Sequence, residues 1–184
     1  MATLFSIGYG NRPWPAMLEL LKQQGCQFLI DVRSSPYSKF TPSYSQDTLA
    51  SLCNDEGIRY VFMGDTLGGK PKGDAYLDES GKVDYIQLSE APEFQFGMAR
   101  LLTAHSKGLC SFLMCSELRP EECHRCKLIG AALAERGVEI IHIDEKGRAI
   151  SQDEAIDRIT GGQEGLFGQD PSINRSRGSY GDKK

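Results

Sequence analysis

The chain has 184 residues, a mass of 20.3 kDa, 40% hydrophobic and 25% charged residues, and a net charge of −4 at neutral pH. These values are typical of one globular domain and exclude a fibrous or fully disordered protein. The acidic excess argues against a protein that coats nucleic acid through bulk positive charge. No apolar run approaches the roughly 20 residues of a membrane span, and the first residues lack the pattern of a secretory signal. We therefore expect a cytoplasmic protein with no membrane partner.

Predicted strands and helices alternate along the chain. Short apolar stretches bounded by glycine predict strands, and hydrophobic residues spaced three and four apart predict helices. The predicted strands span residues 3–8, 27–32, 58–63, 109–115 and 138–143, and the predicted helices span 14 to about 24, 45–56, 93–106, 120 to about 136, and 151–160. Pro120 followed by two glutamates is a strong start signal for the fourth of these helices.

This alternation predicts a single three-layer α/β domain over residues 1–160, with a mostly parallel sheet of about five strands. Residues 161–184 are rich in glycine and serine and predict a flexible tail. In parallel sheets, ligands bind beyond the carboxyl ends of the strands. That rule selects the loops 8–13, 31–44, 64–82 and 116–125 as places for a site.

The densest group of reactive side chains follows the strand at 109–115. We place Cys115 at the exit of this strand, facing the start of the helix predicted from Pro120, whose amides and dipole would lower the pKa of the thiol and hold an oxyanion. This plan, with Leu29-Ile30-Asp31-Val32-Arg33, resembles rhodanese domains and cysteine phosphatases, so the fold is predicted to be Rossmann-like or rhodanese-like. However, no arginine lies six positions after Cys115, and Glu117 would repel an anionic substrate.

Two other interpretations of this group stay open. Cys115, Cys123, His124 and Cys126 are ligand types that bind transition metals, although Cys123 and His124 would point about 100° apart on a regular helix. Alternatively, the group is structural: Cys123 and Cys126 pack in the inner face of the helix, and Glu117 forms a salt bridge with Arg125.

Three further sets of residues follow predicted strands. Asp31 and Arg33 form either an internal ion pair or a site where Arg33 meets a phosphate. Gly8-Tyr9-Gly10-Asn11 predicts a tight turn that lets a ligand approach the backbone, but it is not a full dinucleotide fingerprint, and we expect no cofactor. Lys70 follows two glycines in a loop that either closes over a phosphate or stays in solvent.

Several short segments occur together in the order and rough spacing of a known family. They are Ser6-Ile7-Gly8-Tyr9-Gly10-Asn11-Arg12, Ile30-Asp31-Val32-Arg33-Ser34-Ser35-Pro36, Gly57-Ile58-Arg59-Tyr60, Leu67-Gly68-Gly69-Lys70, and Cys115-Ser116-Glu117 through Pro120 to Cys123-His124-Arg125. Over about residues 3–145 the chain resembles the domain of unknown function 488 family. The resemblance implies a cytosolic α/β domain of bacterial type whose marked positions line one pocket, and it supplies no reaction.

The predicted tail contains a separate motif. Gln163-Glu164-Gly165-Leu166-Phe167 resembles the short peptide by which bacterial replication and repair proteins bind the sliding clamp. Leu166 and Phe167 would enter a pocket as apolar anchors while Gln163 makes a directional hydrogen bond. The alternative is that Leu166 and Phe167 pack on the domain's own surface.

The preferred hypothesis is a pocket at the strand ends that binds a phosphate-bearing ligand, either a nucleotide or a nucleic-acid end. Its expected lining is Gly8, Asn11, Asp31, Arg33, Lys70, Cys115, Glu117, His124 and Arg125. As an enzyme it would use Cys115 or Glu117 as nucleophile or base, Arg33 and Arg125 to hold the anion, and His124 to transfer a proton. The alternatives are a non-catalytic adaptor associated with DNA that docks on the sliding clamp, and a metal-binding protein that uses the cysteine cluster.

Overall fold

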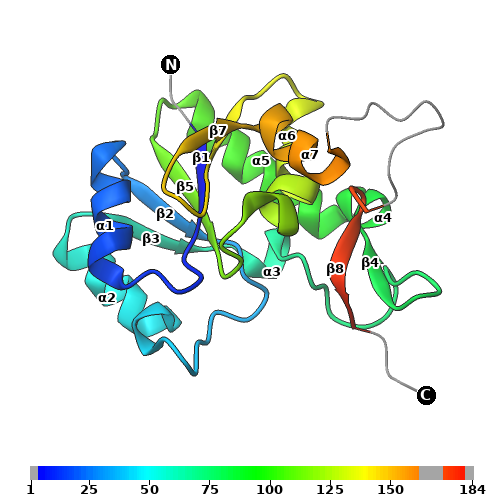
Figure 1. The fold of residues 1–184 in the computed structure, drawn as a ribbon, viewed down its shortest axis with the longest axis horizontal. Helices are drawn as coiled ribbons and strands as arrows, with labels where there is room; N and C mark the ends of the chain where they lie inside the picture. Colours follow the sequence, from blue (N-terminus) through cyan, green and yellow to red (C-terminus); the bar gives the residue numbers. More distant parts are fainter. Residues whose placement is uncertain (1–3, 162–171, 181–184) are drawn as a thin grey trace.

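The computed structural model describes residues 4–161 and 172–180 (Figure 1). Its main sheet has six strands in the order β3-β2-β5-β1-β6-β7. These strands are β1 (Leu4–Gly8), β2 (Phe28–Asp31), β3 (Arg59–Phe62), β5 (Ser111–Cys115), β6 (Ile140–Ile143) and β7 (Ala149–Ser151). All pair in parallel except β7, which runs antiparallel to β6. The predicted α/β class with a mostly parallel sheet is confirmed, with six strands where about five were expected.

Helices cover both faces of the sheet and give the molecule three layers (Figure 1). The helices α1 (Trp14–Gln23) and α2 (Gln46–Asp55) bury Met17, Leu21 and Leu49 in an apolar cluster with one face of the strands. On the other face, α5 (Pro92–Ser106), η3 (Arg125–Gly130) and α6 (Ala131–Ala134) belong to a second cluster, which includes Phe94 and Leu133. Because both faces are covered, the strands are mostly apolar, as is usual for a parallel sheet.

Short elements surround this framework. They are η1 (Pro42–Tyr44), α3 (Gly64–Leu67), β4 (Lys82–Asp84), α4 (Tyr85–Ser89), η2 (Pro120–Glu122), α7 (Gln152–Thr160) and β8 (Arg175–Ser179). No helix in the described part of the chain is long and apolar enough to cross a membrane.

The helix predicted from Pro120 begins later than expected, and this corrects the sequence analysis. Pro120 starts only the 3-10 turn η2, and Cys123 then adopts an extended conformation with φ −116° and ψ 149°. Helical geometry starts at His124, and the first turns, η3, are π-helical. The predicted start of this helix at Pro120 is therefore wrong, and the helix N-terminus that follows Cys115 lies at His124. The extended backbone instead turns the side chain of Cys123 toward the end of β5.

The structure also differs from the expected tail. Residues 175–179 form β8, which pairs antiparallel with β4 (Figure 1). The side chains of β8 hold it in place, because Ser176 Oγ accepts a hydrogen bond from the Val83 amide at 2.9 Å and Arg177 lies 2.6 Å from Glu122. Because these contacts are polar, the sequence of β8 contains no alternation of hydrophobic residues, and its composition predicts a flexible tail.

Candidate functional site

The central strands end beside one another and bring the candidate residues to one edge of the sheet. Gly8 at the end of β1 is in register with Cys115 at the end of β5, and Asp31 at the end of β2 is in register with Met114. This is the edge at which parallel α/β proteins bind ligands. The loop after β5 then returns Glu117 and, after η2, Cys123 and His124 to the same place.

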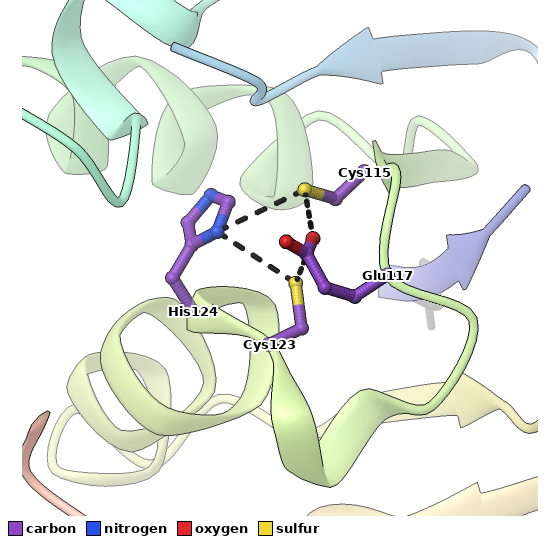
Figure 2. A group of neighbouring side chains, drawn as sticks. All are labelled: Cys115, Glu117, Cys123 and His124. Carbon is purple, nitrogen blue, oxygen red and sulfur yellow. Dashed lines mark hydrogen bonds between the residues drawn. The ribbon is translucent and has the colours of Figure 1, made fainter. Parts of the chain in front are cut away.

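Cys115, Glu117, Cys123 and His124 form one compact group, here called the CEHC cluster (Figure 2). The two thiols donate to the same carboxylate oxygen of Glu117, at 2.8 Å from Cys115 Sγ and 3.3 Å from Cys123 Sγ. Nδ1 of His124 lies 3.8 Å from Cys115 Sγ and 3.6 Å from Cys123 Sγ. The four potential ligand atoms all lie within 4.8 Å of one another.

Contacts behind the cluster fix the His124 ring. Nε2 of His124 lies 3.0 Å from the Val32 carbonyl oxygen and donates to it, and Nδ1 faces the cluster. Gly69 packs directly against the ring, since a Cβ at this position would lie 2.5 Å from His124 Cγ. Only glycine lets the loop approach so closely.

Arg125 holds the loop that carries Glu117. Its Nη2 donates to the Glu117 carbonyl oxygen at 2.7 Å, its Nε donates to Cys123 Sγ at 3.3 Å, and its Nη1 donates to Ser6 Oγ at 3.3 Å. The guanidinium is fully buried. The expected salt bridge between Glu117 and Arg125 is wrong, because Arg125 binds the backbone of Glu117 and not its carboxylate.

The two thiols of the cluster differ in acidity. Burial and the nearby Cys123 and Glu117 hold the pKa of Cys115 well above its ordinary value. Burial also raises the pKa of Cys123, but its interaction with Cys115 and the positive charges of Arg125 and His124 outweigh burial, and the net pKa lies well below the ordinary value. In the absence of another ligand, the structure thus favours a protonated Cys115 beside an acidic Cys123.

A pocket of about 400 Å³ lies above the cluster. Cys115, Glu117 and His124 line it, whereas Cys123 lies behind them. The remaining lining residues are Arg33, Ser34, Ser35, Gly69, Lys70, Tyr85, Ser116, Glu122, Arg177, Gly178 and Tyr180. The pocket is thus polar and carries charges of both signs.

The structure brings only part of the expected lining to the pocket. Arg33 and Lys70 line it, but Asp31 lies beneath Arg33 and binds it through Arg33 Nε at 2.9 Å and Nη2 at 2.5 Å. Arg125 lies below the cluster and does not reach the pocket, and Asn11 is exposed elsewhere. Gly8 contributes close packing, because a Cβ there would lie 1.8 Å from the Glu117 carbonyl oxygen.

Cys126 is separate from the cluster. Although Cys123 and Cys126 form a Cys-x-x-Cys pair in the sequence, Cys126 is buried with Ile150 and Ala155 in a small apolar group. The structural interpretation is therefore right for Cys126. Cys123 is likewise buried with the second apolar cluster, and it also belongs to the CEHC cluster. All six cysteines are free thiols. Gln163, Leu166 and Phe167 lie outside the described residues, so docking on a sliding clamp stays a prediction.

Several lining residues were not predicted from the sequence. Ser34 and Ser35 directly follow Arg33 in a loop that the sequence analysis did select, so their position could have indicated them. Arg177, Gly178 and Tyr180 reach the pocket through β8, and no local sequence signal indicates that contact.

The fold and this cluster define a parallel α/β protein with a buried group of thiol, carboxylate and imidazole side chains at the strand ends. Residues 13–132 match the family described as Domain of unknown function DUF488, and the chain belongs to this family. A search of curated proteins and a search of solved structures gave no significant match.

Proposed function

We propose that the protein is an enzyme that binds a small phosphate-bearing ligand, such as a nucleotide or a nucleic-acid end, in the pocket above the CEHC cluster. The observation that carries this proposal is the position of Cys115, Glu117 and His124 on the floor of a polar pocket at the ligand-binding edge of the sheet. Buried acid, base and nucleophile side chains that converge on a pocket are typical of active sites.

Lys70 is the residue best placed to bind the phosphate. Arg33 and Arg177 also line the pocket, but they are paired with Asp31 and Glu122. Lys70 forms no ion pair among the residues that the structure describes, and its Nζ lies 4.5 Å from the centre of the Tyr180 ring. The hydroxyl of Ser34 accepts a hydrogen bond from the Lys70 amide at 2.9 Å, which fixes the loop beside the pocket.

Glu117 is the base in this proposal. Its carboxylate accepts hydrogen bonds from Cys115 at 2.8 Å and from Ser116 at 3.2 Å, which shows that donors on the pocket floor can reach it. A water or substrate hydroxyl bound at the same place is within reach to give its proton to Glu117.

The test is a calorimetric titration of the full chain with inorganic phosphate and with nucleoside monophosphates. We expect Lys70→Ala to weaken binding by roughly 10–100-fold, because a hydrogen bond to a charged group contributes about 1.5–3 kcal/mol. Lys72→Ala is the matched control, since Lys72 is exposed in the same loop and does not line the pocket. The proposal is contradicted if both variants lose the same affinity for phosphate and nucleoside monophosphates, or if the unmodified chain binds none of these ligands.

A further inference from the structure

We infer that the CEHC cluster is a binding site for one zinc ion, held by Cys115 Sγ, Cys123 Sγ, His124 Nδ1 and a carboxylate oxygen of Glu117. This inference goes beyond the proposed function, which requires no metal. Two thiolates, an imidazole and a carboxylate are all ligands that zinc takes in four-coordinate sites. Thiolates favour zinc over magnesium or calcium, which bind oxygen ligands.

Three of the six ligand-to-ligand distances already match a zinc tetrahedron. Zinc bonds of about 2.3 Å to sulfur and about 2.0–2.1 Å to nitrogen or oxygen give tetrahedral edges of roughly 3.5 Å between sulfur and either lighter atom. The edges from Cys123 Sγ to His124 and to Glu117 are 3.6 and 3.3 Å, and the edge from Cys115 Sγ to His124 is 3.8 Å. The edge from Cys115 to Glu117, at 2.8 Å, must lengthen, and there a thiol proton now forms a hydrogen bond. The remaining two pairs, between the two sulfur atoms and between His124 and Glu117, lie within 4.8 Å of one another and would close onto the metal. Figure 2 shows these four groups facing one another.

Residues around the cluster make the contacts that metal ligands usually need. His124 uses Nε2 to bind the Val32 carbonyl, which leaves Nδ1 free for the metal and fixes the ring. Arg125 donates to Cys123 Sγ and thereby stabilises a thiolate there. Ser116 donates to the Glu117 carboxylate.

Charge balance also allows a dication at this buried position. Zinc brings two positive charges, which the two thiolates balance in the loaded site. Arg125, fully buried beside Cys123, balances the remaining negative charge of Glu117. A buried site with no net charge avoids the large desolvation cost of an isolated ion.

Glu117 is the least buried of the four ligands and, like Cys115 and His124, lines the pocket. It is half-buried in the loop after β5, whereas Cys115, Cys123 and His124 are buried. Displacement of Glu117 by water or substrate would leave three protein ligands and one open position, the arrangement of catalytic zinc sites. This last step rests on the proposed function; the metal site itself does not.

The test begins with the metal content of the full chain, purified under reducing conditions without chelators. Elemental analysis should find about one zinc per chain. Replacement of zinc by cobalt should give the visible absorption of a tetrahedral site together with a sulfur-to-cobalt charge-transfer band. Neither signal depends on a variant that might fail to fold.

Matched variants identify the ligands. Cys123→Ser should weaken zinc binding by more than the roughly 10–100-fold that loss of an outer-shell contact costs. Cys126→Ser should bind zinc like the unmodified chain, because Cys126 lies three positions away in sequence but outside the cluster. Glu117→Gln should retain zinc more weakly and shift the cobalt spectrum, which distinguishes loss of a ligand from loss of the fold.

Three results would overturn the inference. The first is a chain that binds neither zinc nor cobalt, and the second is an equal loss of zinc affinity in Cys123→Ser and Cys126→Ser. The third is a disulfide between Cys115 and Cys123 in the reduced preparation. The two proposals fail separately. A chain that contains zinc but binds no phosphate contradicts only the proposed function, and a zinc-free chain that binds phosphate through Lys70 contradicts only the metal site.

Discussion

Asp31 and Arg33 illustrate how a single buried pair shapes the wall of the pocket. The Asp31 carboxylate accepts hydrogen bonds from the Arg33 side chain and backbone amide and from the Tyr60 hydroxyl at 2.7 Å. Arg33 is only 4% exposed, and its guanidinium lies 5.3 Å from the centre of the Tyr9 ring. Burial lowers the pKa of Arg33, but the hydrogen bonds and negative charge of Asp31 outweigh burial, and its net pKa is raised. Arg33 is therefore a fixed positive charge in the pocket wall.

Asp31→Asn should destabilise the protein strongly. The substitution leaves the Arg33 charge buried without its partner, which costs about 3–5 kcal/mol of the free energy of unfolding. Glu56→Gln is the comparison, because the pair of Lys22 and Glu56 is exposed and contributes at most about 1 kcal/mol. Urea unfolding of both variants measures the difference. If both variants lose a similar, small part of the free energy of unfolding, then Arg33 gains water or another partner once Asp31 is neutral.

At the scale of elements, Asp144 joins the hairpin of β6 and β7 to helix α7. Its carboxylate accepts hydrogen bonds from the amides of Lys146 and Arg148, both at 2.9 Å, and from the side chains of Arg148 at 2.9 Å and Arg158 at 3.1 Å. Burial raises the pKa of Asp144, but these hydrogen bonds outweigh it and lower the pKa to about 2. The charged carboxylate is thus the form that the folded state prefers.

This preference predicts an acid-dependent loss of stability. The pKa of an aspartate in an unfolded chain is about 3.9, so Asp144 contributes fully above about pH 5 and loses its contribution as the pH falls toward 2. Asp144→Asn should lower the free energy of unfolding by about 2 kcal/mol at pH 7, and the gap to the unmodified chain should close near pH 2. Asp153→Asn, an exposed change on α7, should alter stability by less than about 0.5 kcal/mol. A gap for Asp144→Asn that stays constant with pH would argue against the carboxylate's charge as its source.

The sequence predicts elements well where the core dictates their pattern. The strands β1, β2, β3, β5 and β6 and the helices α1, α2 and α5 follow from apolar runs and helical spacing, because each packs hydrophobic side chains into the core. The strands β4, β7 and β8 were not predicted, because none of them contains a long apolar run. β4 and β8 pair with each other although they are distant in the sequence, and β7 is a three-residue strand in a hairpin with β6.

The same limit applied to the candidate site. Cys115, Glu117 and His124 could be grouped from the sequence, because they follow one strand end. The metal interpretation added Cys123, but it took Cys126 as the fourth ligand in place of Glu117, and the proline and glutamates before Cys123 predict a helix on which Cys123 and His124 diverge. Tertiary packing overrides that local signal and extends the backbone at Cys123, so both side chains reach the cluster.

At the scale of the whole molecule, the C-terminal strand reaches the pocket and lies close in the sequence to the predicted clamp motif. β8 lies beside β4 and supplies Arg177, Gly178 and Tyr180 to the pocket. Residues 162–171, which contain the motif resembling a clamp-binding peptide, lie outside the described residues between α7 and β8. Both flanking elements are anchored to the domain, α7 through Arg158 and Asp144 and β8 through Ser176 and Val83. The motif therefore lies in the sequence between two anchored elements, α7 and β8, and β8 forms part of the pocket wall.

The clamp prediction can be tested independently of the pocket. Changing Leu166 and Phe167 together to alanine should reduce binding to a purified bacterial sliding clamp by more than about 100-fold, because burial of each side chain contributes roughly 1.5–3 kcal/mol. Biolayer interferometry with the full chain measures this, and Gln169→Ala, just outside the motif, should bind normally. Phosphate binding through Lys70 should not change in either variant if the two sites act separately. If the clamp binds the double variant as tightly as the unmodified chain, Leu166 and Phe167 are not anchors. If the unmodified chain binds the clamp but not phosphate, the result favours the adaptor over the enzyme.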